Sequence, residues 1–306
     1  MPLVTLPDQD WIEDLGPVDG VEMLSWDIVS EPPRPADVVL VVPPYLGSRE
    51  PLHRLSLLPN LRVVQLLTAG YDDVLPSLPP GVRLANAVGV HDASTAELAV
   101  GLVIAALRGI PEFVLAQRES RWLPLEMRPA LADRHVLLVG YGSVGRAVAS
   151  RLAPFEVALT AVASRPRAGD DLVERVHGVA ELPDLLPRHD VVVVVVPLTA
   201  ATTGLVDAAF LARMADGALL VNVSRGKVLD TDALVAEGGR VRAAVDVTDP
   251  EPLPAGHPLW RTPNVLVSPH VGGATSAFRP RAVRLLRAQL SALGRGEQLR
   301  HVVATG

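Results

Sequence analysis

Three ionisable residues, each placed after a run of apolar residues, could together carry out acid–base chemistry on a small organic acid. They are Arg225, Glu251 and His270. A histidine protonates near neutrality, so it suits a proton donor to the alkoxide that forms when hydride adds to a ketone. A nearby carboxylate would stabilise the imidazolium, and an arginine can bind a substrate carboxylate through two hydrogen bonds and polarise the carbonyl beside it.

Each of these residues also has a structural explanation when it is considered alone. Arg225 could form an ion pair with Asp230. Glu251, between prolines, could stabilise its loop, and His270 could be a structural loop residue. Their shared position favours the catalytic interpretation, because open α/β sheets bind ligands at the carboxyl ends of their strands.

A glycine-rich motif lies between a predicted buried strand and a predicted helix. Its glycines are Gly140, Gly142 and Gly145, in the spacing G-x-G-x-x-G. The first glycine permits a tight turn, the second lets the backbone approach a pyrophosphate, and the third lets the helix pack on the strand. The helix begins near Ser143 and Val144, whose N–H groups would point at the phosphates. We therefore expect a dinucleotide site; the alternative is a tight strand-to-helix turn without a ligand.

The end of the next predicted strand indicates which dinucleotide binds. In an NAD site, an acidic residue roughly 20 positions along accepts a hydrogen bond from the adenosine ribose. Here the residue eighteen positions after Gly145 is Ala163, and Ser164, Arg165 and Arg167 follow. Arginines would pair with a 2′-phosphate through charge-assisted hydrogen bonds of about 1.5–3 kcal/mol each. We therefore expect NADP to be preferred over NAD; the alternative is that these arginines lie on a solvated loop.

Strands alternate with helices along the chain, which predicts an α/β fold with parallel sheets in two Rossmann-like or flavodoxin-like domains. We expect a substrate domain at residues 1–92 and 276–306 and a dinucleotide-binding domain at residues 93–275. The six valines at 191–196 are typical of a strand buried on both faces. Strands are expected at 38–42, 63–67, 82–85, 135–139, 157–162, 191–196, 218–223, 242–246 and 265–268, and helices at 93–107 and 276–294.

The composition argues against several classes of partner. The chain has 306 residues, of which 49% are hydrophobic, and a net charge of −6. Basic residues form no excess or run, so we expect no nucleic-acid partner. The lack of cysteine removes thiolate metal sites and fits a reducing cytoplasm, so we expect no metal and a cytoplasmic location. The start of the chain has no signal-peptide pattern, and the stretch Leu98–Leu107 is too short to span a membrane.

Several blocks resemble the D-isomer-specific 2-hydroxyacid dehydrogenase family over nearly the whole chain. They are P-L-T-A-A-T-T-G at 197–204, V-N-V-S-R-G-K-V-L-D at 221–230 and P-N-V-L-V-S-P-H-V-G-G-A-T at 263–275. The blocks D-V-T-D-P-E-P-L-P-A-G-H-P-L and A-S-T-A-E-L-A-V are most similar to the glyoxylate/hydroxypyruvate reductase branch. The segment S-R-P-R also fits that branch's preference for NADPH.

The resemblance implies a role for each candidate catalytic residue. His270 would be the acid/base, Glu251 its partner, and Arg225 a substrate-binding group. The backbone N–H groups of Ala69 and Gly70 would hold the substrate carboxylate. The active site would lie in a cleft between the two domains.

The resemblance also implies further cofactor contacts. Asp246 would contact the nicotinamide carboxamide, and Thr95, Pro197 and Thr202 would line the cofactor. Members of the family are usually dimers, so we expect a homodimer. The segment from Trp122 to Arg134, in the region that the family uses for dimer contacts, is short in this chain.

The leading hypothesis is an NADPH-dependent reductase of a small 2-oxo acid, such as glyoxylate or hydroxypyruvate, that yields the D-2-hydroxy acid. One alternative is a nucleotide-sensing regulatory protein on the same fold, since such relatives keep similar residues. Another is oxidation of formate or phosphite. The pairing of His270 with Glu251 favours 2-hydroxyacid chemistry over formate oxidation, for which the family pairs histidine with glutamine.

Overall fold

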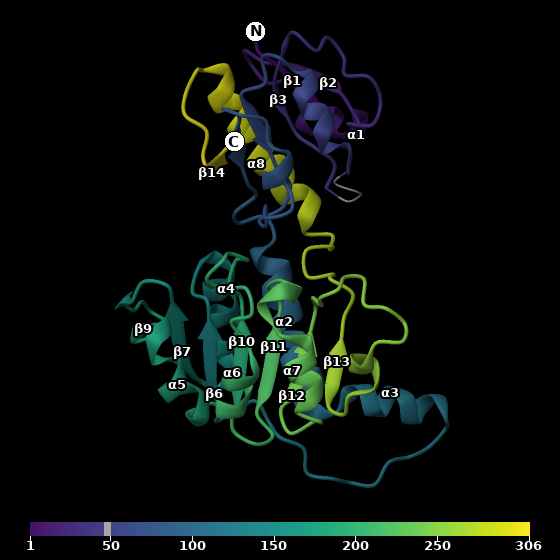
Figure 1. Ribbon diagram of the computed structural model, residues 1–306, viewed down its shortest axis with the longest axis vertical. Coiled ribbons are helices and arrows are strands. Elements are labelled where there is room, and N and C mark those ends of the chain that lie inside the picture. The colour runs from purple at the N-terminus through teal and green to yellow at the C-terminus, as the bar shows by residue number, and fades with distance from the viewer. Residues whose placement is uncertain (46–49) are drawn as a thin grey trace. The chain divides into compact units, whose positions relative to one another are not determined.

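A computed structural model describes residues 1–45 and 50–306 (Figure 1). The chain forms two compact units. Unit 1 comprises Met1–His91 and Ser276–Gly306, and unit 2 comprises Asp92–Thr275. Each unit is an α/β structure, so the predicted fold class is confirmed.

Unit 1 contains a six-stranded sheet in the order β14-β5-β4-β3-β1-β2. All pairs are parallel except β14 with β5. Its strands are β1 Leu3–Leu6, β2 Glu22–Ser25, β3 Val38–Val41, β4 Val63–Gln65, β5 Arg83–Ala85 and β14 Val302–Thr305. Its helices are α1 Gln9–Leu15 and α8 Phe278–Gly294, with the 3₁₀ segments η1 Glu50–Leu57 and η2 Leu75–Ser77.

Both faces of the unit 1 sheet are covered, because successive side chains of a strand point to opposite faces. Val4 and Leu40 pack in one hydrophobic cluster with residues of α1 and α8. Leu3 and Val41, their neighbours in sequence, pack in a second cluster with residues of η1. The C-terminal helix α8 therefore completes the core of the N-terminal part of the chain.

Unit 2 contains an eight-stranded sheet in the order β13-β12-β11-β10-β6-β7-β9-β8, parallel except for β8. Its strands are β6 His135–Val139, β7 Ala158–Ala163, β8 Arg167–Ala168, β9 Arg175–Gly178, β10 Val191–Val194, β11 Leu219–Asn222, β12 Arg242–Val245 and β13 Val265–Val267. Its helices are α2 Asp92–Arg108, α3 Ile110–Arg118, α4 Ser143–Leu152, α5 Leu182–Leu185, α6 Ala208–Arg213 and α7 Thr231–Ala236. Its 3₁₀ segments are η3 Ala153–Phe155, η4 Val179–Glu181, η5 Leu186–Arg188, η6 Gly226–Val228 and η7 Pro258–Arg261.

The unit 2 sheet is sandwiched between two layers of helices. On β10, Val191 and Val193 pack toward α2 and α4, whereas Val192 and Val194 pack toward α5, α6 and α7. All four valines are fully buried, as the run of valines predicts. The chain leaves β6 for β7 on one side and returns to β10 on the other, so the strand order reverses at β6. Open α/β sheets bind their ligands beside such a reversal.

The sequence prediction missed several elements. The strand of valines ends at Val194 rather than at 196, and the elements that no expected range covers include β1, β2, β8, β9, β14, α1, α3, α5, α6 and α7. The sheets are also not wholly parallel, because β8 and β14 are antiparallel edge strands. β8 has two residues and β14 has four, and neither contains a buried residue, so neither shows the buried apolar run that identifies a central strand.

The described residues contain neither a single membrane-spanning helix nor a metal-binding cluster. Within residues 1–45 and 50–306, no single helix is long and apolar enough to cross a membrane. α2 and α3 satisfy the length and composition together, but they are bent by 67°, and α2 contributes six buried residues to the unit 2 core. In the same described ranges, no group of three His, Asp or Glu residues is arranged to hold a metal ion.

Candidate active site

The predicted site residues of unit 2, apart from Thr95 on α2 and Arg167 in β8, follow six neighbouring strands at the carboxyl edge of its sheet. This shared edge arises because parallel strands all end on the same side. In spatial order, the loops carry Ser164 and Arg165 after β7, Gly140–Gly145 after β6, Pro197 and Thr202 after β10, Arg225 after β11, Asp246 and Glu251 after β12, and His270 after β13. The candidate phosphate-binding residues therefore lie at one end of this row and the candidate acid–base residues at the other.

His270 and Glu251 form a direct pair. The imidazole Nδ1 lies 2.5 Å from Glu251 Oε1. The two side chains are 42% and 41% exposed, so a small molecule can reach them. Because Nδ1 faces the carboxylate, Nε2 is the ring nitrogen through which His270 can exchange a proton with a substrate. The sequence named both residues, and the structure brings them together.

The loop that carries Arg225 is fixed by Asn222, the last residue of β11. The Asn222 side chain accepts hydrogen bonds from Ser224 N at 3.1 Å and Ser224 Oγ at 2.5 Å, and it donates to Arg225 O at 3.2 Å. The Arg225 guanidinium donates to Ser224 O at 2.8 Å. Asn222 is 1% exposed, so this anchor is part of the core beneath the loop.

Asp230, the residue that offered a structural explanation for Arg225, has a local role of its own. Its carboxylate caps α7 by accepting a hydrogen bond from Ala233 N at 3.0 Å.

Gly226 lets the Arg225 loop pack closely against the loop after β12, since a Cβ at Gly226 would lie 1.8 Å from Thr248 O.

The glycine-rich loop has the form of a phosphate cradle. Gly140 has φ +107°, and a Cβ there would lie 2.6 Å from Val195 O. A Cβ at Gly145 would lie 2.2 Å from Gly140 O, so both glycines are required by the protein itself. A Cβ at Gly142 would meet no protein atom within 4 Å. Gly142 therefore faces open space where α4 begins, and the N–H groups of the first helical turn lack intrahelical acceptors. These residues fit a dinucleotide pyrophosphate.

We expect Gly142→Ala to weaken NADPH binding by about tenfold or more, the equivalent of one charge-assisted hydrogen bond, without loss of folding. The added methyl group has room in the protein but would occupy the space that the phosphates need. Gly101→Ala, in α2, is the matched control, because a Cβ there also meets nothing within 4 Å. Fluorescence titration with NADPH and thermal unfolding of both variants test the expectation; equal NADPH affinities would contradict it.

A cavity of about 230 Å³ adjoins the glycine-rich loop. Gly142 and Ser143 line it together with three charged residues, Arg146, Arg167 and Asp170, whose net charge is +1. The predicted residues Ser164 and Arg165 are exposed and are not among the lining residues. The cavity therefore has the charge that an additional phosphate on a dinucleotide would need.

Hydrogen bonds fix the positions of the charged residues in this cavity. The Arg167 guanidinium donates to Tyr141 O at 2.6 Å and lies 5.9 Å from the Tyr141 ring centroid. The Tyr141 hydroxyl donates to Asp170 at 2.9 Å, and Arg146 donates to Asp170 at 3.0 Å. Burial and the Asp170 carboxylate raise the pKa of Tyr141 to about 12, so its hydroxyl stays protonated. The Leu172 N–H, helped by Tyr141 and Arg146, lowers the pKa of Asp170.

Sequence reasoning missed Tyr141, Arg146 and Asp170 as lining residues. Arg146 directly follows Gly145 in the first turns of the helix, so its position in the motif was an available signal. Asp170 reaches the cavity because the chain folds back after β8, which the sequence pattern did not indicate.

The other predicted cofactor residues are placed around the same edge. Thr202 Oγ1 donates to Pro197 O at 2.6 Å and so shapes the loop after β10. Thr95 lies near the start of α2, and its Oγ1 would be 3.5 Å from a Cβ at Gly272, close to the segment that follows His270. Asp246 is 2% exposed, and its carboxylate is hydrogen-bonded to that same segment.

Ala69 and Gly70 belong to unit 1, where they follow β4. Asn86 Nδ2 donates to Ala69 O at 2.7 Å, and Thr68 Oγ1 donates to Gly70 O at 2.7 Å. In a trans peptide the N–H points opposite to the C=O, so the Gly70 N–H points away from Asn86. The loop therefore has fixed peptide orientations, as a binding site for a carboxylate requires.

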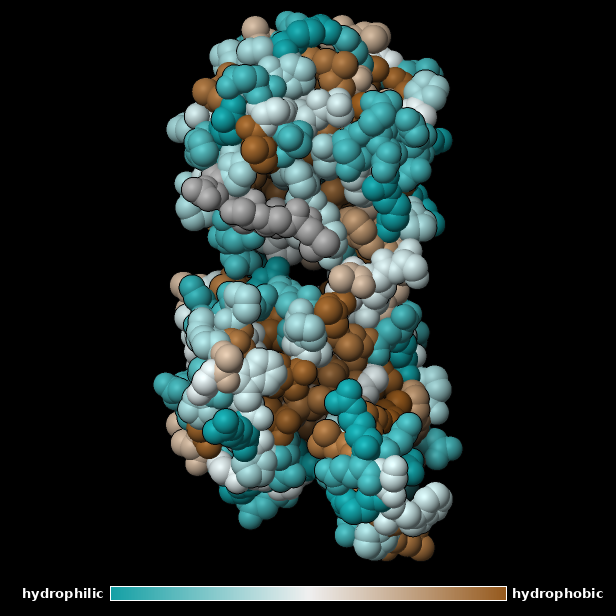
Figure 2. Space-filling view, turned by 90° about the vertical axis from the view of Figure 1, so that its right-hand side faces the viewer, coloured by the Kyte–Doolittle hydropathy of each residue, from teal (hydrophilic) through white to brown (hydrophobic). Residues whose placement is uncertain are grey.

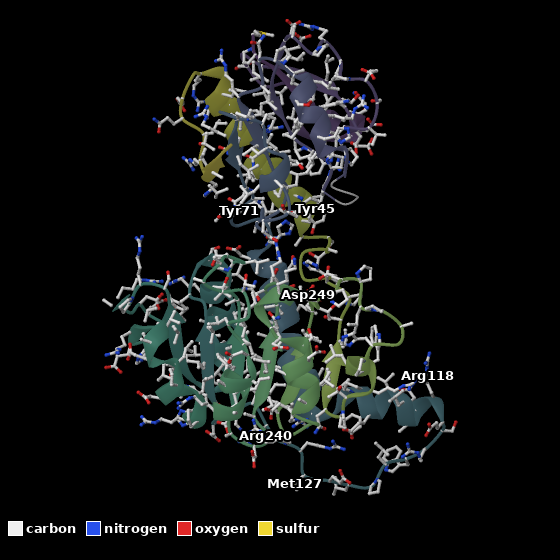
Figure 3. The ribbon with its side chains drawn as sticks, in the orientation of Figure 1. Tyr45, Tyr71, Arg118, Met127, Arg240 and Asp249 are labelled. Carbon is white, nitrogen blue, oxygen red and sulfur yellow. The ribbon has the colours of Figure 1, made fainter. Side chains whose placement is uncertain are left out.

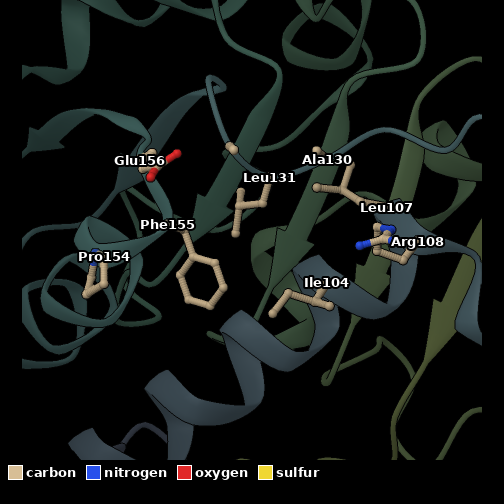
Figure 4. A pocket seen from close by; sticks show the side chains of 9 residues that line it. Ile104, Leu107, Arg108, Ala130, Leu131, Pro154, Phe155 and Glu156 are labelled. Carbon is tan, nitrogen blue, oxygen red and sulfur yellow. The ribbon is translucent and has the colours of Figure 1, made fainter.

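A second cavity in unit 2, of about 350 Å³, lies near the amino end of β6 (Figure 4). The end of α2 contributes Ile104, Leu107 and Arg108 to its lining, and Phe155 and Glu156 lie on its other side. None of the predicted site residues lines it. Because it lies at the opposite end of the strand from the glycine-rich loop, it is separate from the candidate active site.

Comparisons with known proteins place the chain in one family. The model of the family described as "D-isomer specific 2-hydroxyacid dehydrogenase, NAD binding domain" matches residues 100–272. The chain is 35% identical over 249 residues to a glyoxylate reductase of Thermofilum pendens, covering 78% of this chain and 74% of the relative. It is 34% identical over 249 residues to a glyoxylate reductase/hydroxypyruvate reductase of Homo sapiens, covering 78% and 76%. A crystal structure of a D-isomer specific 2-hydroxyacid dehydrogenase from Xanthobacter autotrophicus Py2 in complex with NADPH and MES is 31% identical, with a TM-score of 0.82 and coverage of 99% and 97%.

Proposed function

Since the chain belongs to the D-isomer-specific 2-hydroxyacid dehydrogenase family and is an NAD(P)-dependent oxidoreductase, we propose that it reduces glyoxylate or hydroxypyruvate to the corresponding D-2-hydroxy acid. The observation that carries the proposal is the His270–Glu251 pair on the same sheet edge as the glycine-rich cradle. The names of the two curated relatives supply the substrate class. We assign the dinucleotide to unit 2 and the substrate carboxylate to the Ala69–Gly70 loop of unit 1.

Each residue of the proposed site has a separate task. A bound nicotinamide dinucleotide supplies the hydride. His270 Nε2 donates a proton to the oxygen of the former carbonyl, and Glu251 stabilises the imidazolium before that transfer. Arg225 binds the substrate carboxylate and polarises the carbonyl beside it, and the N–H groups of Ala69 and Gly70 are assigned as further donors to the carboxylate.

The alternative of a nucleotide-sensing regulatory protein predicts dinucleotide binding without turnover. The experiment that separates the two is an assay of NADPH oxidation with a panel of 2-oxo acids, with formate and phosphite tested in the oxidative direction. Our proposal predicts turnover with glyoxylate or hydroxypyruvate. Binding of NADPH without turnover of any 2-oxo acid would favour the regulatory alternative.

We also propose that NADPH is preferred over NADH. Arg167, the first residue of β8, lines the cavity beside the cradle, and Arg165 is exposed two positions before it. No carboxylate ends β7, because Ala163 is there, and the nearby Asp170 is paired with Arg146.

We expect Arg167→Ala to reduce kcat/KM for NADPH roughly 10- to 100-fold, the scale of one or two charge-assisted hydrogen bonds, and to leave NADH nearly unchanged. Arg165→Ala should act in the same direction. Arg188→Ala, an exposed arginine at the end of η5, is the control and should change neither cofactor. Steady-state kinetics with both cofactors tests this; equal losses for NADPH and NADH would contradict it.

We further propose that the protein is a homodimer assembled through α3 and the segment 119–130 (the arm). Seven large apolar side chains are exposed there: Ile110, Phe113, Val114, Leu115, Trp122, Leu125 and Met127. The last three are 98%, 99% and 97% exposed, and Figure 3 shows Met127 on a stretch of chain that loops away from the body of unit 2. Figure 2 shows hydrophobic residues gathered on the face of unit 2 that carries β13 and α3.

A second copy of the chain is the partner that fits this surface. A twofold interface buries the same residues on both copies, so seven side chains from each would cover on the order of 1,000 Å², near the lower end of stable interfaces. Exposed patches of this size on a monomer mark interaction sites.

We expect the protein to sediment as a dimer at micromolar concentration and the double variant Trp122→Ser/Leu125→Ser to sediment as a monomer. Leu57→Ser, at an exposed apolar residue of unit 1, is the control and should stay dimeric. A parent protein that sediments as a monomer, or a dimeric double variant, would contradict the proposed interface.

A further inference from the structure

Asp246, the buried acid after β12, is bonded to most of the segment that carries His270. Its Oδ1 accepts hydrogen bonds from Ser268 Oγ at 2.6 Å and Val271 N at 2.9 Å. Its Oδ2 accepts a hydrogen bond from Gly272 N at 2.9 Å. Its backbone oxygen accepts a hydrogen bond from His270 N at 2.7 Å. One residue that is 2% exposed therefore fixes the chain on both sides of the histidine.

The backbone of His270 explains why such an anchor is needed. Its φ is +53°, in the left-handed region that a residue with a β-carbon adopts only at a cost. Such a conformation persists where the surrounding structure imposes it. If the segment relaxed to a negative φ, the imidazole would move relative to Glu251, which lies on a different loop. The 2.5 Å contact between His270 and Glu251 thus depends on how firmly Asp246 holds the segment.

We propose that Asp246 is a positioning residue for the acid–base histidine: its carboxylate and carbonyl hold His270 in the conformation in which Nδ1 meets Glu251 and Nε2 is available to a substrate. The proposal rests on the proposed function of His270 as proton donor. Three donors to a buried carboxylate also compensate the cost of burying its charge, which is why the anchor is stable.

The resemblance implies a different role for Asp246, contact with the nicotinamide carboxamide. A carboxylate offers about four acceptor sites. Ser268, Val271 and Gly272 occupy three of those of Asp246, so one site is left for a donor such as a carboxamide NH₂ group. The two roles predict different defects. A cofactor ligand chiefly determines the affinity for NADPH, whereas a positioning residue chiefly determines kcat at saturating NADPH and its pH dependence.

Two substitutions weaken the anchor to different extents. Asp246→Asn keeps the shape but replaces one acceptor oxygen by an NH₂ group, which cannot accept a hydrogen bond from either Val271 N or Gly272 N. Ser268→Ala removes a single donor and leaves the carboxylate in place. If Asp246→Asn fails to fold, Ser268→Ala decides the question. Ser150→Ala, which removes a hydroxyl bonded to Ala147 O on α4, is the control.

The kinetic test measures NADPH affinity without substrate, and kcat, KM and the pH profile of kcat with the best 2-oxo acid. We expect Asp246→Asn to lower kcat by about 10²-fold, the scale of a 1 Å displacement of a catalytic group, and Ser268→Ala to lower it less. The pH profile of kcat should change in the same direction in Asp246→Asn as in Glu251→Gln, a variant that removes the charge of the carboxylate paired with His270. NADPH affinity should stay close to that of the parent protein, and Ser150→Ala should match the parent in every measurement.

A second measurement is independent of turnover. In the protein without ligands, we expect the NMR resonances of the His270 imidazole to move in Asp246→Asn, in Ser268→Ala and in Glu251→Gln, and not to move in Ser150→Ala. This result would support the positioning role even if no 2-oxo acid were reduced and the proposed function failed. Unchanged His270 resonances in both variants would overturn the proposal. So would an Asp246→Asn protein that binds NADPH weakly but keeps the parent kcat at saturating NADPH.

Discussion

Replacing His270 with alanine is expected to lower kcat for reduction of the best 2-oxo acid by roughly 10²-fold or more, the usual scale of general acid–base catalysis. Without the imidazole, the alkoxide that forms during hydride transfer must take its proton from water. The Glu251 carboxylate also loses its partner 2.5 Å away and gains no proton to donate. KM for NADPH should change little, because the glycine-rich cradle follows β6, four strands from β13.

The chain contains a matched control for this experiment. His177 Nδ1 lies 2.8 Å from Glu181 Oε2, so it forms a second histidine–glutamate pair in unit 2. His177 is in β9 and Glu181 is in η4, so this pair lies near the edge of the sheet opposite to β13. His177→Ala should keep near-parental turnover. If His270→Ala also keeps near-parental turnover, the assignment of the proton donor is wrong.

Replacing Arg225 with alanine is expected to lower kcat/KM for the 2-oxo acid by roughly 10- to 100-fold, since each charge-assisted hydrogen bond to the substrate carboxylate is worth about 1.5–3 kcal/mol. Both parameters should suffer: KM rises because a carboxylate contact is lost, and kcat falls because the carbonyl is held less firmly. Asn222 anchors the backbone of this loop through its own amide, so the loop should survive the substitution.

Arg225→Lys is the informative partner variant. Lysine keeps the charge but not the two parallel donors, so it should recover only part of the loss. Arg213→Ala, at an exposed arginine on α6, should behave as the parent protein. The measurement is steady-state kinetics at saturating NADPH. An Arg225→Ala protein with the parent KM for the 2-oxo acid and the parent kcat would contradict the role of Arg225.

Those features that depend on short stretches of sequence could be predicted. The α/β class could be predicted from strands such as β10, because a continuous run of valines is typical of a parallel strand covered by helices on both faces. In the structure all four valines of β10 are buried. The pairing of His270 with Glu251 could be expected because each follows a strand and parallel strands end at one edge. Gly140, Gly142 and Gly145 could be named because their spacing is itself the signal.

Features that depend on contacts between distant parts of the chain could not be predicted. Asp170 reaches the cavity through the short antiparallel strand β8, whose two exposed residues carry no periodic pattern. Asp246 holds a segment more than twenty residues away, and nothing in its local sequence shows that its carboxylate is buried and already bonded. The left-handed conformation of His270 is likewise imposed by that contact rather than by residue type.

The product of hydroxypyruvate reduction is the most direct test of the proposed function. The protein is incubated with hydroxypyruvate and NADPH, and the glycerate formed is separated by chiral chromatography and compared with the NADPH consumed. We predict D-glycerate in a one-to-one ratio with NADPH, and roughly a hundredth of that amount or less when His270→Ala replaces the parent protein over the same interval. Formation of L-glycerate, or consumption of no NADPH with hydroxypyruvate or glyoxylate although NADPH binds, would contradict the account.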